Sequence, residues 1–362
     1  MTNNPYQALA TRLDTLPNGY PPTADGTELR ILENLFTPEE AELGSILKLT
    51  LEKPSEIAAR IGADPRVIKK QLKGMARKGL IKAGKTDTGG LGFGLLPFVV
   101  GIYEFQIGNI DAPFAQLFEK YYQQSFVKMT AVEPKFHRVV PVVETVRNDM
   151  AVEPFESAAA IIDGAKAWGV VDCICRVQKN LIGDPCDHPV DVCMTLNQKP
   201  DVFNGNPIVK ALTREEAHAT LQRAADAGFV HSVSNSQDGS SYICNCCTCS
   251  CGILRGISEL GIANVIARSA FVNTVDPEAC AGCEICVDYC QFGALSLRPE
   301  DPYIQINGIK CVGCGACVPQ CPDEALSLVR RPDDEIISIP PTHDDWLHQR
   351  AKARGLDIQE IL

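Results

Sequence analysis

The stretch CAGCEICVDYC (residues 280–290) returns 31 residues later as CVGCGACVPQC (residues 311–321). Both copies have the spacing C-x2-C-x2-C-x3-C, and the repeat continues as ALSL at 294–297 and at 325–328. Such a repeat predicts a duplicated unit in which each half contains a cysteine loop, a short helix and a strand.

The spacing within each copy fits the iron of a cubane cluster, which takes one terminal thiolate per iron. A C-x2-C-x2-C loop wraps three corners of a cubane, and the fourth thiolate comes from elsewhere in the chain. Gly282, Gly313 and Gly315 permit tight turns close to the sulfides, where a Cβ would collide. Two zinc sites are the alternative, because zinc also accepts four thiolates, but the doubled run is far more typical of iron–sulfur centres.

This region closely resembles the bacterial two-cluster ferredoxin domain over about 55 residues. Pro322 follows Cys321 as in the family motif, whereas Gln291 follows Cys290 where the family usually has proline. In that family the fourth cysteine of each half ligates the cluster of the other half. The resemblance therefore implies two [4Fe-4S] clusters, one held by Cys280, Cys283, Cys286 and Cys321 and the other by Cys311, Cys314, Cys317 and Cys290.

The cysteine count and the distribution of apolar residues limit the classes of protein to which this chain can belong. Seventeen cysteines cannot all pair within one chain, which favours metal ligation over a disulfide scaffold. The first 20 residues lack the pattern of a secretory signal, and the longest apolar run, residues 93–103, is shorter than the ~20 residues that cross a bilayer. We therefore expect a soluble, cytoplasmic protein without membrane insertion.

Nine further cysteines precede the repeat and predict additional metal binding. A C-x-C pair places two thiolates on one side of an extended strand, which suits Cys173 with Cys175 and Cys249 with Cys251. The nine could hold two four-iron clusters with one spare thiol, one cluster beside zinc ligands or a reactive pair, or one unusual cluster with more than four thiolates. We expect at least one additional [4Fe-4S] or related cluster. The candidate ligands are Cys173, Cys175, Cys186, Cys193, Cys244, Cys246, Cys247, Cys249 and Cys251.

Two polar residues lie among these cysteines. His188 is either a ligand, since imidazole replaces thiolate in some clusters, or a residue that donates a hydrogen bond to a ligand, or a surface residue. Arg176 either raises the potential of a negative centre or forms an ordinary surface salt bridge. Residues from about 150 to 330 resemble a family of anaerobe proteins that join a CxCR segment and a CNCC-type run to a C-terminal dicluster ferredoxin.

Residues 38–103 resemble a winged helix-turn-helix domain. Thr37 and Asp64 are good N-caps with proline after them, and Ile68, Leu72 and Met75 form an apolar stripe on the third helix. Two strands around KTDTGG would form the wing. The opposite face of the third helix could meet DNA phosphates through Arg66, Lys70, Lys73 and Arg77.

The predicted fold class is α+β, with five successive regions. They are an N-terminal segment (1–37), a winged-helix-like domain (38–103), a cysteine-rich mixed α/β domain (104–275), a dicluster ferredoxin domain (276–330) and a C-terminal tail (331–362). A helix is expected over 154–167.

The favoured function is electron transfer through two or more [4Fe-4S] clusters, as a ferredoxin-type carrier or as a subunit of an oxidoreductase in anaerobic metabolism. The net charge of −11 would suit a basic docking face on a redox partner protein. The alternatives are an iron–sulfur redox-sensing transcription regulator that binds DNA, and catalysis at an open iron site. No catalytic residue is assigned.

Overall fold

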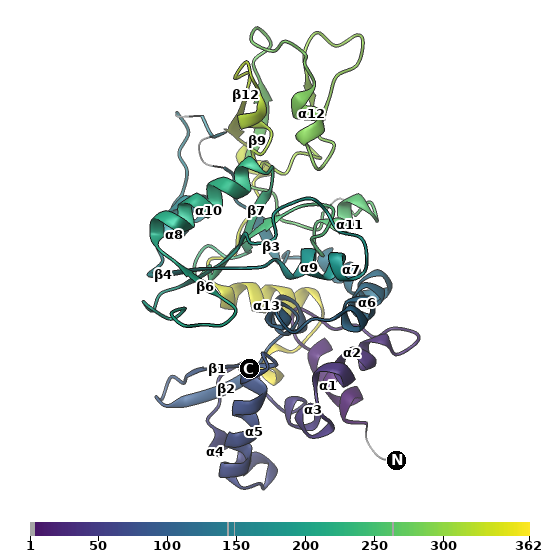
Figure 1. The fold of residues 1–362 in the computed structure, drawn as a ribbon, viewed down its shortest axis with the longest axis vertical. Helices are drawn as coiled ribbons and strands as arrows, with labels where there is room; N and C mark the ends of the chain where they lie inside the picture. The colour runs from purple at the N-terminus through teal and green to yellow at the C-terminus, as the bar shows by residue number, and fades with distance from the viewer. Residues whose placement is uncertain (1–3, 143–144, 148, 263) are drawn as a thin grey trace. The chain divides into compact units, whose positions relative to one another are not determined.

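A computed structural model describes residues 4–142, 145–147, 149–262 and 264–362 of the chain (Figure 1). The chain divides into two compact units, residues 1–133 with 347–362, and residues 134–346. The fold is mixed α+β in the first unit and in the second, as expected.

The first unit is largely helical and contains one hairpin. Its helices are α1 (Pro5–Asp14), α2 (Thr27–Leu35), α3 (Pro38–Gly44), α4 (Pro54–Ile61), α5 (Pro65–Arg77), α6 (Ala112–Tyr121) and α7 (Val127–Thr130). Its strands β1 (Ile81–Lys85) and β2 (Leu91–Leu95) pair antiparallel. Short helical turns are η1 (Phe98–Ile102), η2 (Glu104–Gln106), η3 (Tyr122–Phe126) and η8 (Ile358–Glu360).

The helix starts expected near residues 37 and 64 are confirmed. Thr37 forms a capping box with Glu40, and the Asp64 side chain accepts a hydrogen bond from the Arg66 amide. Ile68, Leu72 and Met75 are buried as the apolar stripe requires. The order helix, helix, helix, hairpin is therefore present in residues 38–95.

The structure groups the segments around this region differently from the predicted domain boundaries. Residues 104–133 belong with the first unit, because α6 packs Phe118 and Tyr121 against an aromatic group that includes Phe98 and Tyr103. The end of the chain also belongs there. Buried Arg350, on α13 (His343–Ala353), donates hydrogen bonds to the carbonyl oxygens of Pro17, Met129 and Val132.

The second unit is built on a six-stranded antiparallel sheet with the order β3-β7-β8-β5-β4-β6. The strands are β3 (His137–Val139), β4 (Ala167–Val171), β5 (Cys193–Asn197), β6 (Lys210–Leu212), β7 (Val230–Ser234) and β8 (Tyr242–Cys246). Helices α8 (Ala158–Asp163) and α10 (Arg214–Asp226) share a core with it, which includes Ile162, Ala217, Met194 and Ile243.

The helix expected over 154–167 is shorter in the structure. A turn, η5 (Pro154–Glu156), precedes α8, and Ala167 already begins β4. The remaining helices of this sheet region are α9 (Ile174–Leu181) and α11 (Arg255–Ser258).

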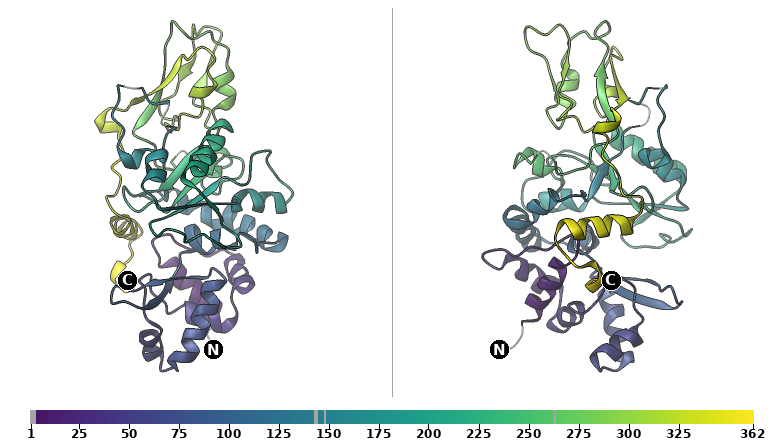
Figure 2. Two further views of the ribbon diagram at one scale, coloured as in Figure 1. Left: turned by 60° about the vertical axis from the view of Figure 1, so that its left-hand side comes forward. Right: turned by 180° about the vertical axis from the view of Figure 1, so that it is seen from behind.

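The repeat region forms two small sheets and two short helical turns. Strand β9 (Phe271–Val275) pairs antiparallel with β12 (Leu326–Arg330), and β10 (Leu295–Ser296) with β11 (Gln305–Ile306). Each half has its helical turn, α12 (Ile285–Tyr289) and η6 (Val318–Gln320), and η7 (Asp333–Glu335) follows β12. Strands β9 and β12 lie beside α12 in the views of Figures 1 and 2. The predicted duplication of loop, helical turn and strand is therefore seen in the fold.

Candidate metal centres

The first cysteine loop of the repeat, residues 280–286, is called the outer loop, and the second, residues 311–317, the inner loop. The outer loop brings its three thiols together with that of Cys321. Burial, together with the thiols of Cys321, Cys283 and Cys280, raises the pKa of Cys286 to about 11. Cys283 is exposed, whereas Cys286 is buried. The structure thus brings together the cysteines that the family resemblance assigns to one cluster.

The inner loop gathers the other four. Burial raises the pKa of Cys314 to about 12, with further contributions from Cys311 and Cys290. Burial also raises the pKa of Cys317, and the thiols of Cys314, Cys290 and Cys311, with Cys286 of the first loop, contribute to the same shift. Cys290 thus interacts with the second loop and Cys321 with the first, as a crossed ligand assignment would require.

Hydrogen-bond donors reach the sulfur atoms of this region. The amides of Ala294 and Ala325 donate to Cys290 and Cys321 at 3.3 Å each, at matching positions of the two halves. The Asn273 Nδ2 amide donates to Cys317 at 3.1 Å. Donors on sulfur stabilise its negative charge and tune the potential of a bound cluster.

The backbone at the inner loop leaves no room for side chains. A Cβ on Gly313 would lie 2.1 Å from the Phe271 carbonyl oxygen, and one on Gly315 would lie 2.3 Å from Thr145 Oγ1. Both residues also have positive φ, 70° and 77°. The donor set, the sulfur-directed amides and these tight turns fit a pair of iron–sulfur clusters.

Three adjacent strands bring most of the remaining cysteines to one end of the large sheet. Strand β4 ends at Val171, directly opposite Cys193 at the start of β5, and Cys173 follows at the start of α9. Ile243 of β8 pairs with Met194, so Cys244 comes next on the neighbouring strand. Because these strands are antiparallel, the end of β4, the start of β5 and the end of β8 meet.

Six of these cysteines form one continuous set, which we call the six-thiol group. It consists of Cys173, Cys175, Cys193, Cys244, Cys246 and Cys251. Hydrogen bonds with Cys175 and Cys193 hold the pKa of Cys173 well below its usual range. Hydrogen bonds with Cys173 and Cys251 raise the pKa of Cys175, and Cys244 and Cys251 both bond Cys246.

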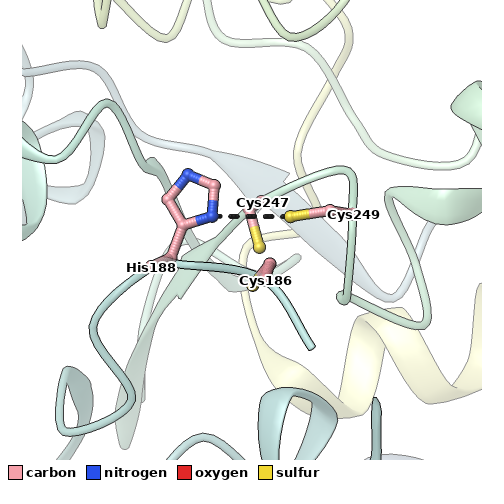
Figure 3. A group of neighbouring side chains, drawn as sticks. All are labelled: Cys186, His188, Cys247 and Cys249. Atoms are coloured by element: carbon pink, nitrogen blue, oxygen red, sulfur yellow. Dashed lines mark hydrogen bonds between the residues drawn. The ribbon is translucent and has the colours of Figure 1, made fainter. Parts of the chain in front are cut away.

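The other three cysteines join a histidine in the Cys/His group, Cys186, His188, Cys247 and Cys249 (Figure 3). Their ligand atoms all lie within 4.8 Å of one another. Cys249 Sγ lies 3.5 Å from His188 Nδ1. A hydrogen bond with Cys249, helped by the charges of Arg176 and His188, lowers the pKa of Cys247 to about 5. This arrangement could bind a metal ion.

Arg176 lies between the two groups and is only 3% exposed. Its Nη2 donates to the Asn245 carbonyl oxygen at 2.7 Å, and its guanidinium lies 4.1 Å from the Phe229 ring centre. Burial lowers the pKa of Arg176, but the thiolates of Cys173, Cys247, Cys193 and Cys246 outweigh this and raise it. Of the two alternatives for Arg176, the surface salt bridge is therefore wrong, because the side chain is buried among thiols.

Two expectations about the nine cysteines need correction. Cys173 is the N-cap of α9 and Cys175 lies within that helix, so this C-x-C pair is not on an extended strand. Cys249 lies in a turn beyond the end of β8, and Cys251 directly follows that turn. The proximity of Cys173, Cys175 and Cys193 does not extend to Cys186, which lies in the other group.

Gln291 connects the repeat region to the cysteine run at 244–251. Its Oε1 accepts a hydrogen bond from the Thr248 amide at 2.8 Å, and its Nε2 donates to the Gly228 carbonyl oxygen at 2.6 Å. The sequence marked Gln291 only as a departure from the usual proline. Nothing in the sequence indicated Asn273 as a donor to sulfur, since a single asparagine on a strand carries no signal.

Comparison with known proteins identifies one region of the chain. Residues 279–325 match the family described as "4Fe-4S dicluster domain". No curated protein and no solved structure matches the chain. Among the described residues, no helix combines the length and the apolar character needed to cross a membrane.

Proposed function

We propose that this chain is an electron-transfer protein that moves single electrons through two [4Fe-4S] clusters in its dicluster region and through at least one further metal centre. The match of residues 279–325 to the dicluster family carries the proposal. Within that region we assign Cys280, Cys283, Cys286 and Cys321 to one cluster and Cys311, Cys314, Cys317 and Cys290 to the other.

The surroundings of the two loops support a direction for the transfer. Cys283 is exposed, so the outer loop can approach a redox partner protein. The inner loop is buried against the rest of its unit, with the Val142 amide donating to the Cys314 carbonyl oxygen at 3.1 Å. Gln291 follows Cys290 and bonds directly to Thr248, between Cys247 and Cys249. Electrons would thus enter at the outer loop and pass inward toward the central cysteines.

Metal analysis of the protein, purified without air, tests this function. The dicluster region predicts about eight iron and eight acid-labile sulfide per chain, and a further cluster would raise the iron to about twelve or more. The iron should accept electrons from a chemical reductant, with bleaching of its visible absorption. A colourless chain whose eight repeat cysteines hold zinc would contradict the proposal.

A second function, DNA binding, is supported by one surface of the first unit. Arg66, Lys70, Lys73 and Arg77 are exposed on α5, opposite the buried stripe. Ten Lys/Arg against three Asp/Glu make residues 52–85 basic within an acidic chain. Such a helix face can contact phosphates.

Binding to duplex DNA at several salt concentrations tests this second function. Neutralising Arg66, Lys70 and Lys73 together should weaken binding and reduce its salt dependence, whereas K352Q, at an exposed lysine elsewhere in the unit, should not. Equal binding by both variants would exclude α5 as the DNA-contacting helix.

A further inference from the structure

The Cys/His group has the dimensions of a site for a single ion. Zinc binds thiolate at about 2.3 Å in a tetrahedron, which places neighbouring ligand atoms roughly 3.8 Å apart. The four ligand atoms all lie within 4.8 Å of one another, close to that requirement. A cubane holds its thiolates on the outside of a larger body and so spaces them further apart. Three thiolates and one imidazole are also a common ligand set for structural zinc.

The six-thiol group offers more ligands than one ion can take. Tetrahedral zinc takes four, and a four-iron cubane takes one terminal thiolate per iron. The six thiols lie at the start of α9, at the start of β5, in β8 and shortly after β8, and thiol–thiol hydrogen bonds join them. Cys173, Cys246 and Cys251 are buried. Such a number of thiols suits a cluster better than a single ion.

Arg176 provides an independent sign that an anion belongs here. Its Nε and Nη1 atoms are buried and have no hydrogen-bond partner among the described residues. No carboxylate is paired with it in the part of the chain that the structure describes, and the ionisable groups that act on it are thiols of both groups. A buried guanidinium costs several kcal/mol unless negative charge compensates it. A polynuclear thiolate-ligated centre would supply that charge.

We propose that the nine central cysteines serve two different metals. The six-thiol group holds an iron–sulfur cluster separate from those of the dicluster region, Arg176 is the positioning cation beside it, and the Cys/His group holds one zinc ion. This inference deepens the proposed function, because it identifies the further centre toward which the dicluster region would pass electrons.

The test compares single-cysteine variants of the full chain, purified without air and analysed for iron, zinc and sulfide. The wild-type protein should contain about twelve or more iron and about one zinc per chain. C193A should lose the iron in excess of about eight and keep the zinc, whereas C249A should lose the zinc and keep all of the iron. Mössbauer spectra of the C193A protein should retain only the signals of the dicluster region.

Several outcomes would overturn the partition. Loss of iron in C249A, loss of zinc in C193A, or a wild-type chain with about eight iron and additional zinc would each do so. In the last case electron transfer through the two dicluster clusters stands, whereas this inference and the further redox centre of the proposed function both fail. A chain without any iron would contradict both.

Arg176 provides a second measurement for the case in which the cysteine variants do not fold. R176M should lower the reduction potential of the additional cluster and leave the two dicluster potentials unchanged. R176K keeps the positive charge, so its potential should return most of the way to the wild-type value. R223Q is the matched control, since Arg223 is exposed and pairs with Asp191. If every potential in R176M equals that of the wild-type protein, Arg176 does not face a cluster.

Discussion

The two halves of the cysteine repeat share one sequence pattern and differ in their surroundings. In the outer half, Cys283 and Glu284 are exposed, and a Cβ on Gly282 would meet only Leu297, at 3.4 Å. In the inner half, Gly313 and Gly315 are buried against backbone and side chains of the same unit. The duplication therefore has one exposed half and one half built into its own unit. The cysteine spacing is the same in both halves, and their packing is what distinguishes them.

The largest expected difference between the halves follows from the glycines. Gly282 and Gly313 occupy matching positions with φ of 68° and 70°, so an alanine costs about 1–2 kcal/mol at either position from the backbone alone. G313A also forces a Cβ to within 2.1 Å of the Phe271 carbonyl oxygen. We expect G313A to lose much of its iron and G282A to retain it, as measured by iron per chain and by the thermal midpoint. Similar losses in both variants would show that the inner half is not more tightly packed.

The second largest expected difference between the two halves is the reactivity of their thiols in the iron-free chain. Cys283 is exposed, whereas burial raises the pKa of Cys314 to about 12 and keeps it protonated at neutral pH. Because only the thiolate alkylates, Cys283 should react much faster than Cys314 at pH 8, by about 100-fold or more. The rate at Cys314 should rise as the pH increases toward 12. Mass spectrometry of peptides after timed alkylation gives both rates, and equal rates would indicate that the inner half is open without its clusters.

The position after the last cysteine of each half provides a third comparison. Gln291 in the outer half corresponds to Pro322 in the inner half, and only Gln291 bonds Thr248 and Gly228. Q291L removes both hydrogen bonds and should cost about 1–3 kcal/mol of stability without loss of iron. Denaturation without air measures the cost, with Q320L as the control. An unchanged stability would mean that Gln291 does not link the repeat to the central cysteines.

Substitution of Asn273 should have a smaller effect, on the reduction potential of one cluster only. Its amide donates to Cys317, so it favours the reduced, more negative state of a cluster held there. N273L should lower that potential, and a loss of about 1 kcal/mol corresponds to roughly 40 mV for one electron. The other dicluster potential should not move. Redox titration followed by electron paramagnetic resonance distinguishes the two, and T274V is the control on the same strand.

The sequence predicted the parts of the fold that depend on local pattern. The duplication and the capping of α3 and α5 followed from spacing and residue type, and the structure has both. The division of the central cysteines could not be predicted, because it depends on how strands β4, β5 and β8 pair, and about 70 residues separate the first of these strands from the last. The C-x-C expectation failed at Cys173 because that residue caps a helix, where side chains no longer alternate with period two.

The smallest expected effect is at Glu284, whose counterpart in the inner half is Gly315. Glu284 has φ of 62° and Gly315 has φ of 77°, so both adopt the left-handed region, which disfavours residues with a Cβ. E284G removes this strain but adds freedom to the unfolded chain, so a net stabilisation of about 0.5 kcal/mol is expected. The reverse exchange, G315A, should be strongly destabilising, because its Cβ would lie 2.3 Å from Thr145 Oγ1. Thermal midpoints of the two variants measure the difference. If G315A is as stable as the wild-type protein, the contrast between an open and an enclosed half of the repeat is wrong.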